Sequence, residues 1–173
     1  RYGVTQEYDY IENSIYKCFL ACDAVSDETL LSYHYRCSPK IIEFNNRKYY
    51  NHKLHIASRE TDPTPLVYVD VPNDTTDEKN TAPQEVRRIE AYLTAHPDKQ
   101  VGIITPFARQ RAAIEAMLRA NHYDNASCGT VHAFQGDEKD VVIFSLALTN
   151  RTQQRTYNWL KNNKELINVA VSR

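Results

Sequence analysis

The strongest signal for the fold lies in TVHAFQGDEKDVVIFSLALT, residues Thr130–Thr149. Its second part, Asp140–Leu148, is apolar at almost every position, which predicts a strand with both faces buried. Strands of this kind belong to parallel sheets that helices cover on both faces. Gly136 and the three charged residues at 137–139 precede the strand, so a ligand site and a solvated strand entry both fit this position.

Strands and helices alternate along the rest of the chain. Further strands are predicted at Leu30–Arg36, Leu66–Val71 and Val101–Ile104. Ser38–Pro39 and Thr105–Pro106 each place a hydroxyl residue before a proline, which is typical of a helix start. This alternation predicts an α/β domain with a mostly parallel sheet flanked by helices. Helical spacing of apolar residues predicts helices from Gln84, through Ile114, Met117 and Leu118, and at Glu165–Arg173.

The composition is that of one domain of ordinary size. The chain has 173 residues, of which 42% are hydrophobic and 25% charged, and no apolar run is long enough to span a membrane. The N-terminus carries no secretory signal, so we expect a cytoplasmic protein with reduced cysteines. Cys18, Cys22, His34 and Cys37 leave a zinc site open, but their spacing matches no usual pattern of paired zinc ligands.

Charge is segregated along the sequence although the net charge is only −1. Residues 36–59 hold six basic residues against Glu43, and residues 60–80 hold six acidic residues against Lys79. Segregation of this kind gives a protein one basic face, which is either a plain solvated surface or a surface for phosphates.

Two familiar catalytic motifs are missing from this sequence. None of the four glycines precedes a Lys-Ser or Lys-Thr pair, so the chain has no phosphate-binding P-loop. It also has no Gly-x-Ser-x-Gly nucleophile elbow. Two arginines stand out instead, Arg36 directly after a predicted strand and Arg173 on the predicted terminal helix. Their planar guanidinium groups suit phosphate oxygens, although single arginines more often form surface ion pairs.

Four segments then occur in one order: YHYRCSPKIIEFNNRKYYNHKL (33–54), VGIITPFARQRAAI (101–114), TVHAFQGDEKDVVIFSLALT (130–149) and LINVAVSR (166–173). Together they resemble the second RecA-like domain of superfamily 1 helicases, in the branch of the nonsense-mediated-decay RNA helicase and related DNA helicases. The resemblance implies a P-loop NTPase-like fold that lacks its own P-loop. It covers residues 30–173, ends within the family's final motif, and leaves 1–29 as a lead-in.

The resemblance also implies roles in ATP hydrolysis. Arg36 and Arg173 match arginines that reach the γ-phosphate, where the transferred phosphoryl group develops its charge. Gln135, Gly136 and Glu138 match the nucleotide-facing part of their motif. ATP with Mg²⁺ is then expected between this domain and a first RecA-like domain that carries the P-loop. The chain taken alone is expected to be an inactive part of an ATP-dependent helicase.

A second set of matched residues implies contact with a single strand of nucleic acid. Thr105 and Pro106 match the family's helix-start motif, Thr130 matches a phosphate contact, and Gln110 matches a glutamine near the strand. The basic residues from Arg47 to Lys53 are expected on the same side. DNA is favoured over RNA as the partner, and a monomer is expected. Cys37-Ser38 departs from the Met-His of the decay-helicase branch.

Two other classes of function compete with this interpretation. A binding module that has lost ATP chemistry would keep the fold, but it would have no reason to keep both arginines. A metal-dependent nuclease is suggested by Glu138 and Lys139. Adjacent residues on a strand point to opposite faces, however, so these two cannot reach one metal ion together.

Overall fold

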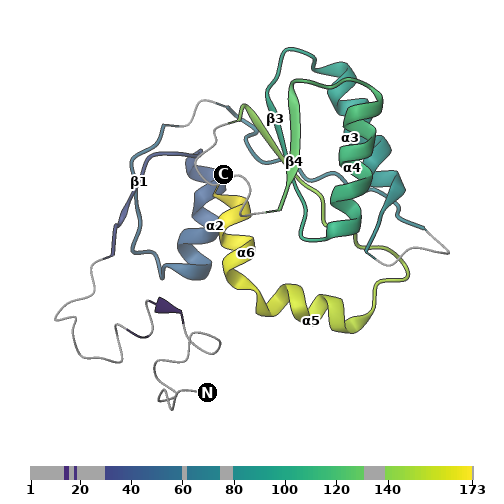
Figure 1. Ribbon diagram of the computed structural model, residues 1–173. Helices are drawn as coiled ribbons and strands as arrows, with labels where there is room; N and C mark the ends of the chain where they lie inside the picture. Colours follow the sequence, from purple (N-terminus) through teal and green to yellow (C-terminus); the bar gives the residue numbers. More distant parts are fainter. Residues whose placement is uncertain are drawn as a thin grey trace. The chain divides into compact units, whose positions relative to one another are not determined.

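The computed structural model describes residues 14, 15, 18, 30–59, 62–74, 80–130 and 139–172 (Figure 1). The chain divides into two compact units, Arg1–Ser32 and Tyr33–Arg173. The elements discussed below all belong to the second unit. In chain order they are β1 (Tyr33–His34), α2 (Pro39–Tyr49), β2 (His55–Ile56), α3 (Pro83–Ala95), β3 (Val101–Ile104), α4 (Ala108–Ala120), β4 (Ala126–Gly129), β5 (Val141–Phe144), α5 (Gln154–Asn162) and α6 (Lys164–Val171).

The main sheet is parallel, with β3 between β4 and β5. Val101 of β3 aligns with Ala126 and Val141, and Ile104 aligns with Gly129 and Phe144. The three strands therefore end at the same edge of the sheet. This arrangement confirms the α/β fold with a parallel sheet that the sequence predicts.

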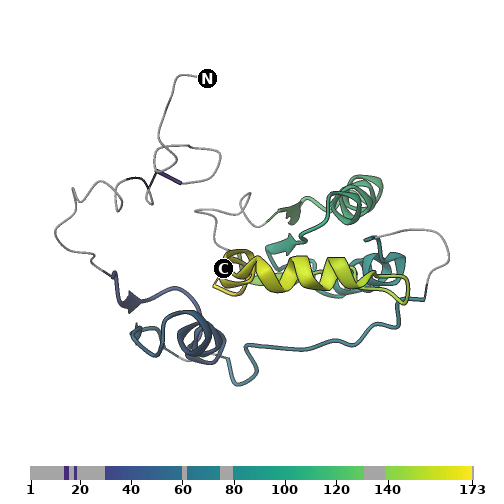
Figure 2. The same ribbon diagram turned by 90° about the horizontal axis from the view of Figure 1, so that it is seen from below.

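Helices pack on both faces of this sheet because the side chains of β3 alternate between the two faces. Val101 and Ile103, both fully buried, join a cluster with residues of α3 and α4. Ile104 joins a second cluster with Ala170 of α6. Figure 2 shows α3 and α4 on one side of the strands and α2 and α6 on the other. The predicted apolar stripes on α3 and α4 are thus core positions, with Leu93 and Ile114 fully buried.

β1 and β2 form a separate parallel pair, in which His34 aligns with Ile56. α2 connects the two strands and begins at Pro39 after Ser38, as predicted. Asn46, near the end of α2, is buried and closes the connection. Its side-chain oxygen accepts the Leu54 N–H (2.9 Å), and its amide donates to the Leu54 carbonyl (3.3 Å).

Two predicted strands differ from the structure. Leu30–Arg36 forms a strand only at Tyr33–His34. Leu66–Val71 is assigned to no strand, and its Tyr68 side chain is 87% exposed. Both segments have the composition of strands, but a strand needs a paired neighbour, which the segment itself does not supply.

The predicted start of α4 is also wrong by two residues. The helix begins at Ala108 after Phe107, not at Pro106. The Thr105 hydroxyl accepts the Phe107 N–H at 3.4 Å, so it closes a short turn before the helix instead of capping it. β4 and α5 have no counterpart in the prediction. Over the part of the chain that the structure describes, no helix is long and apolar enough to cross a membrane.

Candidate functional site

Two of the residues predicted to bind nucleic acid come together at the carboxyl ends of the three parallel β-strands. Thr105 follows β3 and Thr130 follows β4. The Thr105 N–H donates to the Gly129 carbonyl (3.2 Å), and the Ser145 N–H donates to the Ile104 carbonyl (2.8 Å), so the ladder extends just past the strands. In open α/β sheets this edge is where ligands bind.

The two threonines differ in how they face this edge. Thr105 is fully buried, whereas Thr130 and Pro106 are both half-buried. The Thr105 hydroxyl therefore acts inside the turn, through its bond to Phe107. At this turn Pro106 is partly exposed, and the Thr130 side chain is partly open as well.

Gln110 is fully buried, which the sequence did not predict. Its amide oxygen accepts the Ala82 N–H (2.8 Å), and its amide nitrogen donates to the Ser145 hydroxyl (2.9 Å). The same hydroxyl donates to Glu85 at 2.6 Å. Since these bonds hold Gln110 inside the domain, its side chain lines no surface in this structure. Its position is that of a support behind the strand ends.

Arg36 lies in the turn between β1 and α2, where its side chain is exposed. His34 closes this turn: its Nε2 accepts the Cys37 N–H at 3.0 Å and lies 3.1 Å from the Cys37 sulfur. Because Nε2 is an acceptor, the proton of the neutral ring is on Nδ1. Burial, and then the charge of Arg36, lower the pKa of His34, which favours this neutral form at pH 7.

The helices next to the two predicted catalytic arginines are bonded to each other. The Asn45 amide of α2 donates to the Asn168 carbonyl of α6 (2.8 Å), and the Asn168 amide donates to the Tyr50 hydroxyl (3.0 Å). Figure 1 shows the two helices side by side and antiparallel. The start of α2, which follows Arg36, therefore lies at the same end as the end of α6.

The remaining predicted site residues are Gln135, Gly136, Glu138 and Arg173, and all four lie outside the described residues. Their assignment to the nucleotide side stays a prediction.

Two of the described cysteines, Cys37 and Cys128, are held in the protonated thiol form. Burial raises the pKa of Cys37, and burial followed by the charge of Glu115 raises that of Cys128 to about 12. A protonated thiol is a poor nucleophile and a poor metal ligand. Over the described ranges, no group of three or more His, Cys, Asp or Glu side chains is placed to hold a metal ion. Cys22, part of the open zinc set, lies outside those ranges.

Sequence reasoning missed Glu85 and Ser145. Glu85 is the acid in the first turn of α3, and it accepts the Ser145 hydroxyl and the Ala147 N–H (3.1 Å). An acid near a helix start is ordinarily a surface feature, so the pattern alone gives no signal for this role. The serine in the apolar run Asp140–Leu148 was the available clue, because a buried hydroxyl needs a partner.

Comparison with known proteins identifies the family of this chain. Residues 11–173 match the family model described as an AAA domain. The chain is 28% identical to the DNA polymerase alpha-associated DNA helicase A of Saccharomyces cerevisiae, over 83% of this chain and 26% of that protein. It is 28% identical to the Regulator of nonsense transcripts 1 homolog of Arabidopsis thaliana, over 83% of this chain and 13% of that protein.

A shorter match reaches a higher identity. The chain is 35% identical to the Regulator of nonsense transcripts 1 homolog of Drosophila melanogaster, over 43% of this chain and 7% of that protein. The chain thus spans no more than about a quarter of each of these relatives. The family match covers most of the chain, and the relatives are helicases or regulators of nonsense transcripts by name. The chain belongs to the AAA-domain family and is a superfamily 1 helicase domain.

Proposed function

We propose that this chain is the second RecA-like half of an ATP-driven motor that moves along single-stranded nucleic acid. Residues 30–173 form the domain, and residues 1–29 lead into it. A P-loop-bearing domain of the same protein would supply the other half. Closing on ATP and opening after hydrolysis would move the strand stepwise.

The observation that carries this proposal is the pairing of α2 with α6. Arg36 leads into α2, and Arg173 follows α6 in the sequence. The Asn45–Asn168 bond ties the two helices together, with the start of α2 and the end of α6 at one end of the pair (Figure 1). This arrangement supports a joint role for the two arginines at one phosphate group.

The exposed Arg36 guanidinium fits a polyphosphate, because its planar fork pairs with phosphate oxygens. ATP with Mg²⁺, held jointly with the P-loop domain, supplies the phosphoryl group. Arg36 and Arg173 would place positive charge where that group develops negative charge. Gln135, Gly136 and Glu138 would line the nucleotide side.

The single-stranded nucleic acid would lie at the carboxyl edge of the parallel sheet. Thr130 and the backbone of the Thr105–Pro106 turn would contact its phosphates there, with the basic residues from Arg47 to Lys53 adding charge. Phosphate contacts of this kind position a strand without reading its sequence. Gln110 supports the turn from inside through its bonds to Ala82 and Ser145. We favour DNA over RNA as the strand and a monomer as the working form.

The proposal is tested by replacing the arginines in a protein that joins this chain to its P-loop domain. Arg36→Ala and Arg173→Ala should each lower the ATPase rate by roughly a thousandfold, because arginines of this type stabilise the transition state. Affinity for a labelled single strand should stay near that of the wild type.

Arg88→Ala is the matched control, since Arg88 is an exposed arginine on α3 to which the resemblance assigns no role. It should leave both the ATPase rate and strand affinity unchanged. Normal turnover in both Arg36→Ala and Arg173→Ala would overturn the assignment of this domain to ATP hydrolysis.

A further inference from the structure

α5 combines exposed aromatic rings with positive charge. Tyr157 is 41% exposed and Trp159 is 42% exposed, whereas Leu160 between the helix and the core is buried. From residue 151 to residue 164 the chain has four basic residues and no acidic one, a net charge of +4. All four basic side chains, Arg151, Arg155, Lys161 and Lys164, are exposed.

Trp159 lies against the turn that carries Thr105 and Pro106. Its ring centroid is 6.0 Å from that of Phe107, at an interplanar angle of 39°. Phe107 is 9% exposed and packs with Ala82, Ala147 and Leu160, so it forms a firm backing for the indole. Trp159 therefore extends the carboxyl edge of the sheet with a partly exposed aromatic surface.

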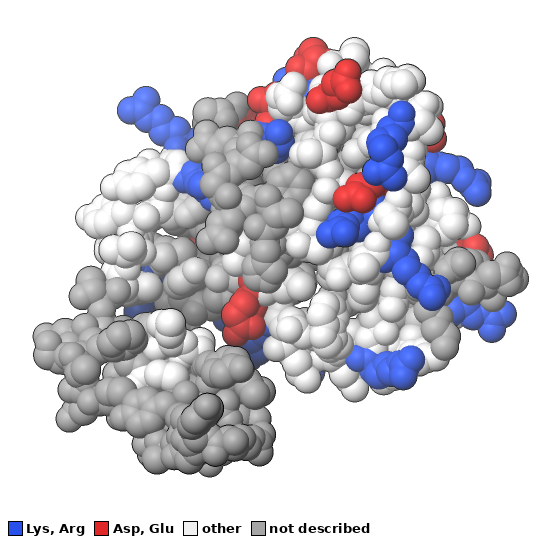
Figure 3. All heavy atoms as spheres, viewed as in Figure 1, with Lys and Arg blue, Asp and Glu red and all other residues white. Residues whose placement is uncertain are grey.

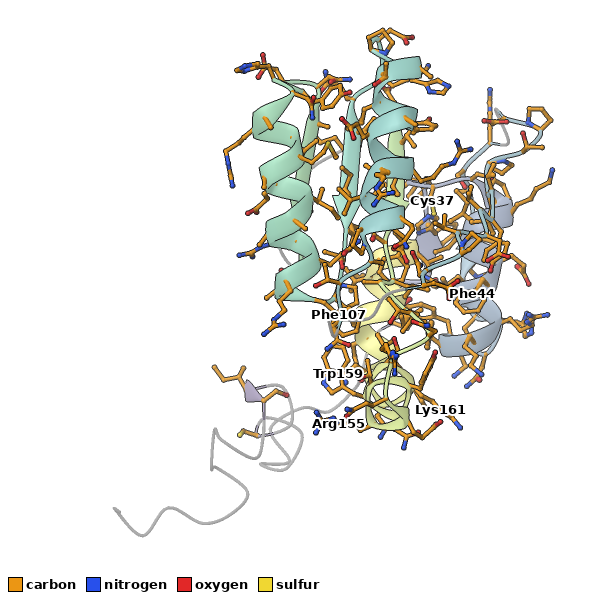
Figure 4. All side chains as sticks on the ribbon, turned by 90° about the vertical axis from the view of Figure 1, so that its right-hand side faces the viewer. Cys37, Phe44, Phe107, Arg155, Trp159 and Lys161 are labelled. Atoms are coloured by element: carbon orange, nitrogen blue, oxygen red, sulfur yellow. The ribbon has the colours of Figure 1, made fainter. Side chains whose placement is uncertain are left out.

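Arg155 lies one helical turn before Trp159, on the same side of α5. Figure 4 shows Phe107, Trp159 and Arg155 in a row, with Lys161 on the other side of the helix. In Figure 3, Lys and Arg side chains extend along the α3–α4 side toward the end where α5 lies; acidic side chains lie at the opposite end and also lower down, between the basic ones and near the lower centre of the view. A polyanion is the partner that this charge distribution favours.

A protein partner would fit this surface less well. Protein interfaces are depleted of lysine, whereas α5 presents Lys161 and nearby Lys164 beside its aromatic residues. Aromatic rings interleaved with basic side chains are the arrangement with which proteins hold single strands, because bases stack on the rings and phosphates pair with the charges. The row is also continuous with the Thr105–Pro106 turn, to which we assign contacts with the backbone of the nucleic acid.

We propose that Trp159, backed by Phe107 and flanked by Arg155, is a base-stacking subsite for the single strand. This inference rests on the proposed function and adds a subsite outside the motifs that carry the family resemblance. The Thr105–Pro106 turn and Thr130 contact phosphates, and α5 contacts the face of a neighbouring base. Because every base has such a face, the subsite tolerates any sequence.

Trp159 is the single tryptophan of the chain, so its fluorescence reports on this subsite directly. We would titrate the chain with oligothymidylate and with an abasic strand of equal length and charge. Oligothymidylate should quench the fluorescence in a saturable way. The abasic strand should leave it unchanged and bind about five- to a hundredfold more weakly, the range expected for loss of one stacked base.

Variants then separate stacking from charge. Trp159→Ala should weaken oligothymidylate binding by a similar factor, and Trp159→Phe by less, with circular dichroism confirming the fold of each. Tyr157→Ala is the matched control, because Tyr157 is equally exposed but two residues away, on the other side of the helix. Its affinity should stay within about twofold of the wild type.

The outcomes distinguish the subsite from the proposed function. The subsite would be refuted if the chain bound both nucleic-acid strands with equal affinity, without quenching of fluorescence, and if Trp159→Ala left that affinity unchanged. The motor assignment would still stand in that case. Absence of binding by either strand at low salt would overturn both. Shielding of Trp159 from acrylamide by an added P-loop domain, with no effect of the strand, would assign α5 to the domain interface instead.

Discussion

At the scale of single residues, His34 controls the turn that presents Arg36. Its Nε2 accepts the Cys37 N–H, and the Cys37 thiol lies beside the same nitrogen. A protonated imidazole has no acceptor, so this turn requires the neutral ring. Burial and the charge of Arg36 lower the pKa of His34 and keep the ring neutral near pH 7.

This arrangement predicts a pH dependence of the turn. A group whose pKa is lowered on folding contributes stability above its unfolded pKa, here 6.5, and loses that contribution as the pH falls through the folded value. We expect the Cys37 amide resonance to shift on acidification. The midpoint of this shift should equal the midpoint of the His34 ring titration, and both should lie below pH 6.5. Two-dimensional NMR from pH 8 to pH 4.5 measures both.

His34→Gln is the control for this titration, because a glutamine oxygen accepts a hydrogen bond at any of these pH values. The Cys37 resonance of this variant should not follow a histidine titration. A His34 midpoint at or above 6.5, or a Cys37 resonance that ignores the His34 titration in the wild type, would contradict the proposed bond.

At the scale of elements, Glu85 joins α3 to the segment that follows β5. Its carboxylate accepts the Ser145 hydroxyl (2.6 Å), the Ala147 N–H (3.1 Å) and the Asn73 amide (2.7 Å). Gln110 of α4 reaches the same Ser145 hydroxyl. One carboxylate thus connects the segments around the carboxyl edge of the sheet, where the candidate site lies.

Glu85→Ala is therefore expected to destabilise the domain by about 2–3 kcal/mol, because it leaves buried donors without an acceptor. Glu85→Gln should cost less, since one amide oxygen still accepts. Glu90→Ala, on the same helix, is the control and should change the free energy of unfolding by less than about 0.5 kcal/mol. Urea unfolding measures all three. Equal stability of Glu85→Ala and Glu90→Ala would show that the network contributes nothing.

At the scale of the whole chain, the segment Leu66–Val71 is an exposed apolar surface. Leu66, Val67, Tyr68 and Val69 are between 48% and 87% exposed, and the segment belongs to no strand. An apolar run of β-branched and aromatic residues outside any sheet is a template for pairing with another chain.

The monomer favoured above is the form joined to its P-loop domain; the isolated 173-residue chain, with this segment exposed, is expected to associate with itself at high concentration. Val67→Lys should reduce this association, because a lysine on an exposed strand opposes pairing of two copies. Thr64→Lys adds the same charge at an exposed, less apolar position close by and is the control. Sedimentation over a range of concentrations gives the mass of each. A monomer at all concentrations, or equal effects of the two lysines, would refute the role of this segment.

Elements whose signals are local could be predicted from the sequence. β3 and β5 have continuous apolar runs, α3 and α4 have apolar stripes at helical spacing, and α2 begins at its serine and proline. The four-segment pattern also indicated the family. β4 is not predicted from the sequence, because Ala-Ser-Cys-Gly consists of small residues without a strand pattern. This segment becomes a strand by pairing with β3.

Which side chains are exposed depends on the tertiary packing, which local patterns do not reveal. Gln110 is buried because Ala82 and Ser145 happen to meet its amide, and Thr105 is buried because β4 lies beside it. Trp159 reaches the candidate site through Phe107, about 50 residues away in the sequence. Such contacts depend on how distant segments pack, so a local pattern cannot contain them, whereas the period of a helix or strand is written into the segment itself.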